Sequence, residues 1–68
     1  MLNKNFWPFQ VTMKNLDESP DPRRKWMGEH LYHGGHYEPN WYILEHYKEN
    51  TYCFKDEKEY IHFLLIWQ

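Results

Sequence analysis

Residues 54–68 read FKDEKEYIHFLLIWQ, and this stretch determines the structure of the C-terminal part of the chain. Asp56 is a residue type that caps helix N-termini, and two glutamates follow it at positions that favour the positive end of a helix dipole. The residues spaced for one helical face are Tyr60, Phe63, Leu64 and Trp67. We therefore expect a helix from about Asp56 to Leu64, with an extended end as the alternative beyond it.

Two strand patterns precede this helix. From Trp41 to Tyr47 the side chains alternate, with Trp41 and Ile43 on the opposite face from Tyr42. After a short connection, Thr51 to Phe54 forms a second strand pattern. The two segments together predict a β-hairpin.

The N-terminal half begins with another alternating segment. From Phe9 onward, apolar side chains alternate with polar ones, which predicts a half-buried strand. A loop follows, and Asp21-Pro22 is a favourable helix entry. We expect a helix from about Pro22 to His33, with Trp26, His30 and His33 along one face, and Gly34-Gly35 ending it.

The predicted order of elements is β-α-β-β-α. This order favours one small α+β domain over residues 1–68, in which a short antiparallel sheet carries two helices on one face. The residues expected to meet in its core are Phe9, Val11, Trp26, Ile43, Phe54, Phe63 and Trp67.

Composition limits the function of the chain. Its 68 residues carry a formal net charge of −2, which is not the basic footprint of a duplex-binding domain, and 21% of them are aromatic. The apolar run Phe63–Trp67 is far shorter than the ~20 residues of a membrane span, and no segment resembles a signal peptide. A single cysteine and the lack of a targeting segment suit a reducing cytoplasm, so we expect a cytoplasmic protein with no membrane association.

Few residues form a pattern that could carry chemistry. His30, His33 and His36 are spaced H-x-x-H-x-x-H, but Gly34-Gly35 breaks the helical register before His36. Cys53 alternates within a predicted strand, where a lone thiol is usually inert. We therefore expect no metal, no cofactor and no catalytic residue, and hence no enzyme.

A basic cluster gives the alternative function. Arg23, Arg24 and Lys25 are consecutive and lie near several aromatic residues in sequence. Cations beside rings bind single-stranded nucleic acids by backbone contact and base stacking. The competing interpretation is a solvated first helical turn whose charge is offset by nearby acidic residues.

The C-terminal segment also resembles the tail of small uncharacterised proteins of tailed bacteriophages, which end in a pattern close to F-x-D-E-x-D/E-A-x-x-F-x-L-x-W. The matching positions, within about the last fourteen residues, are Phe54, Asp56, Glu57, Glu59, Phe63, Leu65 and Trp67. This chain departs from the pattern at Tyr60, where a small residue is usual, and at Leu64 and Ile66, where basic residues are frequent. The resemblance implies a phage accessory protein and transfers no catalytic residue.

From these observations we expect a phage-encoded interaction protein that acts by binding, as an inhibitor or modulator of a host defence or transcription component. The expected interface consists of Leu64 and Ile66, with Tyr60 beside them. Its expected partner is a host protein or a second copy of the chain; a nucleic acid remains the alternative partner.

Overall fold

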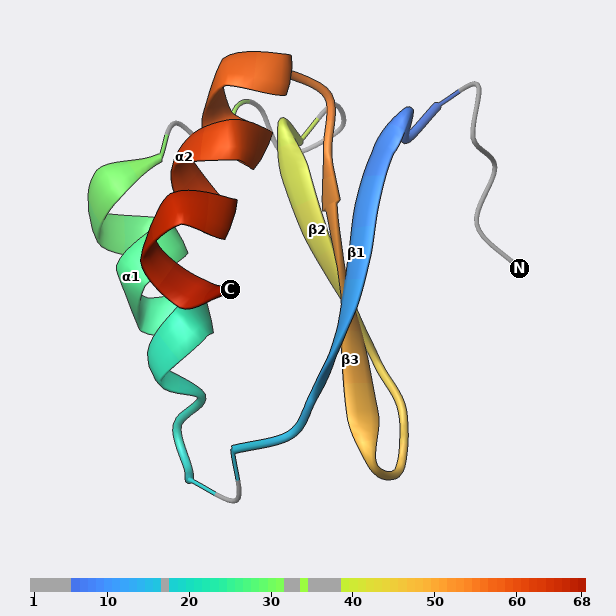
Figure 1. Ribbon diagram of the computed structural model, residues 1–68, viewed down its shortest axis with the longest axis vertical. Helices are drawn as coiled ribbons and strands as arrows, with labels where there is room; N and C mark the ends of the chain where they lie inside the picture. The colour runs from blue at the N-terminus through green and yellow to red at the C-terminus, as the bar shows by residue number, and fades with distance from the viewer. Residues whose placement is uncertain (1–5, 17, 32–33, 35–38) are drawn as a thin grey trace.

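The computed structural model describes residues 6–16, 18–31, 34 and 39–68. Its elements, in chain order, are β1 (Phe9–Lys14), α1 (Pro22–His30), β2 (Trp41–Glu45), β3 (Glu49–Phe54) and α2 (Glu57–Trp67). The predicted β-α-β-β-α order and the α+β class are therefore confirmed. Both helices lie on the same side of the sheet (Figure 1).

The sheet is antiparallel, with strand order β1-β3-β2. Phe54 of the central strand pairs with Phe9 on one side and with Trp41 on the other, and two residues away Tyr52 pairs with Val11 and Ile43. Because side chains alternate along a strand, these residues all face the helices. The sheet thus presents one apolar, ring-rich face to the helix layer.

The hairpin between β2 and β3 is tighter than the sequence predicted. The His46 backbone N–H donates to the Glu49 carbonyl at 2.9 Å, which leaves Tyr47 and Lys48 at the turn. Asn15 holds this turn from outside, because its backbone N–H donates to the Lys48 carbonyl at 3.0 Å. Accordingly β2 ends at Glu45 rather than at Tyr47.

The core lies between the sheet and the two helices. Its buried members are Met27, Leu31, Trp41, Ile43, Tyr52, Phe54 and Phe63, and those packed against them include Phe9, Val11, Trp26 and Trp67. All seven residues predicted for the core therefore belong to this cluster, three of them buried and four at its margin.

Helix α2 continues further than predicted. The Asp56 side chain accepts a hydrogen bond from the Lys58 backbone N–H at 2.9 Å and so caps the helix. The helix then runs to Trp67, and Gln68 is its C-cap. Helical geometry to the end brings Trp67 against the core one turn after Phe63, and the extended alternative is wrong.

Helix α1 departs from its prediction in length and orientation. It ends at His30, because Leu31 adopts an extended conformation and is buried in the core. Trp26 and His30 lie on one face as predicted, with their rings stacked at 5.0 Å between centroids, but it is the neighbouring Met27 that is fully buried, while His30 is exposed. Gly34, with φ of 90°, lies beyond the helix end and does not cap it. The predicted extension to His33 and the role of Gly35 fall on residues outside the described part of the chain.

Candidate functional site

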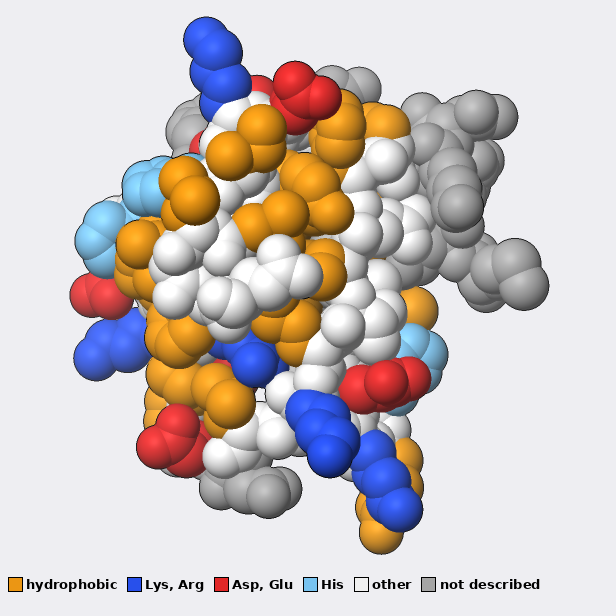
Figure 2. All heavy atoms as spheres, in the orientation of Figure 1, with side chains coloured by type: hydrophobic (Ala, Val, Ile, Leu, Met, Phe, Trp, Pro, Cys, Tyr) orange, Lys and Arg blue, Asp and Glu red, His pale blue; other side chains and the backbone are white. Residues whose placement is uncertain are grey.

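Three apolar side chains on the outer side of α2 are exposed, and we call them the α2 patch: Ile61, Leu65 and Ile66. Their exposed fractions are 47%, 78% and 51%. Ile61 and Leu65 are one turn apart and adjoin on the helix surface, while Ile66 lies about 100° further round. Figure 2 shows hydrophobic side chains gathered over the part of the molecule where Figure 1 draws α2.

The opposite side of α2 fixes this orientation. Phe63 has no exposed surface, and its ring centroid lies 5.0 Å from that of Tyr52 and 5.2 Å from that of Phe54. Tyr60 stacks on Phe9 at 5.5 Å between ring centroids and donates a hydrogen bond to the Gln10 carbonyl at 3.4 Å. With these rings held on the sheet, a residue two positions after Phe63 must point away from it.

The three residues predicted for the interface have different environments. Ile66 is exposed, as expected. Leu64 is half-buried and packs against the core, so its expected exposure is wrong. Tyr60 is also half-buried, among aromatic rings of the sheet.

Leu65, the most exposed residue of the α2 patch, was not singled out from the sequence. Leu65 matches the bacteriophage pattern, whereas Leu64 and Ile66 depart from it, so the resemblance pointed to Leu64 and Ile66 instead. A helical wheel centred on Phe63 provides the missing signal, because it puts Leu65 almost opposite the buried face.

A small aromatic cluster borders the α2 patch on the side of α1. The ring centroid of Trp26 lies 5.0 Å from that of His62 and 5.0 Å from that of His30. Since Ile66 follows His62 by one helical turn, the patch continues through His62 toward α1. Aromatic rings from both helices therefore border the α2 patch on this side.

The predicted basic cluster does not form one cationic surface. Arg23 is only 7% exposed, and its Nη1 donates to the Lys14 carbonyl at 2.8 Å. Arg24 forms an ion pair with Glu45, with an Nη1–Oε1 distance of 3.2 Å. Of the three residues, Lys25 and Arg24 are exposed, and the Arg24 charge is offset by Glu45.

Arg23 instead belongs to a buried polar network that joins α1 to the sheet. Asp21 accepts hydrogen bonds through Oδ2 from the Tyr52 hydroxyl at 2.8 Å and from Asn50 Nδ2 at 3.3 Å. The Arg23 guanidinium lies 5.6 Å from the Tyr52 ring centroid, a cation–π distance. This network connects the start of α1 to the centre of β3, and it accounts for the buried charge.

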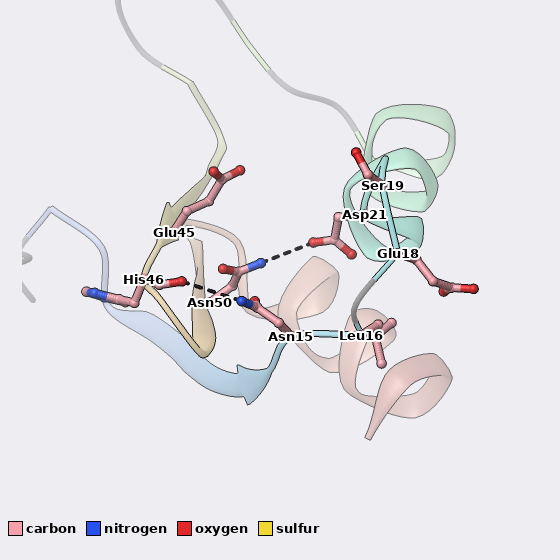
Figure 3. Close-up of a pocket in the computed structure, with 8 residues that line it drawn as sticks. All are labelled: Asn15, Leu16, Glu18, Ser19, Asp21, Glu45, His46 and Asn50. Carbon is pink, nitrogen blue, oxygen red and sulfur yellow. Dashed lines mark hydrogen bonds between the residues drawn. The ribbon is translucent and has the colours of Figure 1, made fainter.

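A polar cavity of about 330 Å³ adjoins this network (Figure 3). It is lined by Asn15, Leu16, Glu18, Ser19, Asp21, Glu45, His46 and Asn50. Two of its three carboxylates are already engaged, Asp21 by the network and Glu45 by Arg24. The described residues that line the cavity therefore offer no free pair of carboxylates for acid–base work.

The described residues assemble no catalytic or metal-binding cluster of the usual kinds. Cys53 is fully buried, and burial raises the pKa of its thiol to about 11, which opposes the nucleophilic thiolate form. Within the described ranges, no three His, Cys, Asp or Glu side chains come together as candidate metal ligands. His33 and His36 lie outside those ranges.

The chain was also compared with known proteins. No family model, no curated protein and no solved structure matches it. In the part of the chain that the structure describes, no helix is long and apolar enough to cross a membrane.

Proposed function

We propose that this protein acts by binding another protein, and that the α2 patch is the contact surface. The observation that carries the proposal is the 78% exposure of Leu65, between Ile61 and Ile66, on a helix whose opposite side is fixed in the core. Contiguous exposed apolar side chains on a small domain are characteristic of contact surfaces, because burying them in a partner removes apolar area from water.

The polar groups of the described residues support binding rather than catalysis. The Asp21–Arg23–Asn50–Tyr52 network is internally satisfied to a large degree and serves to attach α1 to β3. The only thiol, that of Cys53, is buried. Neither feature offers a nucleophile beside a base that substrate could reach.

Residues 54–68 resemble the C-terminal segments of small bacteriophage proteins, and this resemblance supports a host macromolecule as the target. On this proposal the protein inhibits or modulates a component of host defence or transcription in the cytoplasm of the host cell. A small domain with a preformed apolar surface suits this role, because it loses little conformational freedom on binding.

A photo-crosslinking experiment tests the contact surface. A benzophenone amino acid replaces Leu65 in one variant and Tyr47 in a matched control, since Tyr47 is 90% exposed at the hairpin turn. We expect crosslinks from position 65 to a protein other than this chain in a nuclease-treated bacterial extract, and loss of these crosslinks when Ile61→Lys is added. Equal crosslinking from position 47, or none from position 65, would refute the proposal.

The salt dependence of binding distinguishes the nucleic-acid alternative from binding to a protein. Binding through phosphate contacts weakens steeply as salt rises, whereas binding through the α2 patch changes little. Arg24→Ala with Lys25→Ala removes the exposed cations of the basic cluster. We expect this double variant to retain the crosslinks from position 65.

A further inference from the structure

We infer that, when no target is bound, the α2 patch is covered by a second copy of this chain, with the two α2 helices packed antiparallel across a twofold axis. The inference rests on the proposed function, because it concerns the same contact surface in the absence of its target. In a twofold dimer each copy contributes the same surface patch, so one self-complementary patch is sufficient to form the contact.

The distribution of charge along α2 selects the antiparallel orientation. Glu57, Lys58 and Glu59 all lie in the first turn, and residues 60–68 contain no Asp, Glu, Lys or Arg. The last turn carries no basic residue to offset its exposed carbonyl groups. A parallel pair would place the two first turns, each with a net charge of −1, side by side, whereas an antiparallel pair separates them.

The spacing of the patch fits the same arrangement. A twofold axis that passes between the levels of Phe63 and Leu64 sets Ile61 opposite Ile66 of the second copy. The same axis sets Leu65 opposite His62. Each exposed aliphatic side chain then meets an apolar or aromatic group, and the charged first turns lie at the two ends of the contact.

The size of the surface predicts a weak dimer. Helix α2 has 11 residues and is therefore about 16 Å long. A contact along one such helix is smaller than the ~800 Å² per partner of a standard interface. We therefore expect a dissociation constant of about 10 µM to 1 mM, and a mass that depends on concentration.

Sedimentation equilibrium from about 10 µM to 1 mM tests the dimer. The wild-type chain is expected to pass from monomer to dimer across this range. Leu65→Lys should raise the dissociation constant at least tenfold with an unchanged circular dichroism spectrum, and Tyr47→Lys, an equally drastic change outside the patch, should not. A wild-type protein that stays monomeric to 1 mM would overturn the inference, while crosslinking from position 65 would still decide the proposed function.

Disulfide trapping tests the orientation. Ile61→Cys and Ile66→Cys chains are oxidised separately and as a mixture, and the buried Cys53 present in all of them serves as the unreactive control. An antiparallel pair predicts that the mixture forms the 61–66 disulfide at least tenfold faster than either chain pairs with itself. Faster self-pairing of either chain would overturn the antiparallel arrangement.

Discussion

The double role of Asp21 gives the most discriminating test of how this fold is held together. Its Oδ1 accepts a hydrogen bond from the Arg23 backbone N–H at 2.9 Å and so caps α1. Its Oδ2 accepts from the Tyr52 hydroxyl and from Asn50 Nδ2, both on the central strand. Asp21→Ala therefore removes a helix cap and an attachment of α1 to the sheet at once.

Asp56 provides a matched control for the cap alone. It caps α2 in the same way, with a 2.9 Å hydrogen bond from the Lys58 backbone N–H at an exposed position. Asp56→Ala should cost about 1 kcal/mol. Asp21→Ala should cost that amount and a further ~1–3 kcal/mol, because the hydroxyl of the fully buried Tyr52 loses its acceptor.

Thermal and urea unfolding at neutral pH measure the difference. A domain of 68 residues has a free energy of unfolding of roughly 3–10 kcal/mol, and each kcal/mol changes its Tm by about 4–8 °C. We expect a decrease of about 4–8 °C for Asp56→Ala and of at least about 10 °C for Asp21→Ala. Equal losses for the two variants would refute the attachment.

A double-mutant cycle isolates the bond itself. Tyr52→Phe removes the hydroxyl and keeps the ring in the core. Combined with Asp21→Ala, it should show a coupling free energy of at least about 1 kcal/mol, because the two groups contact each other at 2.8 Å. Additive losses would contradict the structure at this point.

The remaining predictions concern the core, the patch, the thiol and metals. Phe63→Ala should cost about 3–5 kcal/mol and largely unfold the domain, as measured by circular dichroism; a Tm within a few degrees of the parent would show that Phe63 is not a core residue. Leu65→Lys, two positions away, should change the free energy of unfolding by less than ~0.5 kcal/mol. Burial raises the pKa of Cys53 from 9.0 to about 11, so the native state retains a proton that the unfolded state loses, and stability should fall as pH rises from 9 to 11. The thiol should react with iodoacetamide only on unfolding. Treatment with a strong chelator should leave the melting curve unchanged, and a decrease restored by zinc would reveal a structural metal.

The parts of the fold that depend on local periodicity were predictable. The alternating patterns that begin at Phe9 and at Trp41 predicted β1 and β2, with ends within about two residues of the observed ones. Both helix starts followed from an aspartate whose side chain accepts a backbone N–H two residues later. Strand alternation and helix capping depend on residues that are close in sequence, so both can be inferred from the sequence.

The features that depend on tertiary packing were not predictable. The end of α1 is set by Leu31, which leaves helical geometry and enters the core, although a glycine pair further on gave the stronger local signal. Arg23 looked like part of a basic surface, and it is buried because Tyr52 and Asp21 meet beside it. Asp21 and Tyr52 are 31 residues apart, and no pattern within either segment indicates that they meet.

The last turns of α2 show why the proposed contact surface could be located only with the structure. Phe63 and Leu65 are separated by one residue and are similarly apolar, yet one is fully buried and the other is 78% exposed. In a strand they would share a face, whereas in a helix they point in nearly opposite directions. Once the helix is established, the core accounts for Phe63 and Trp67 but not for Ile61 and Leu65, whose replacement by charged residues would cost the fold little. Their apolar character is therefore the basis of the proposal that another chain covers this surface.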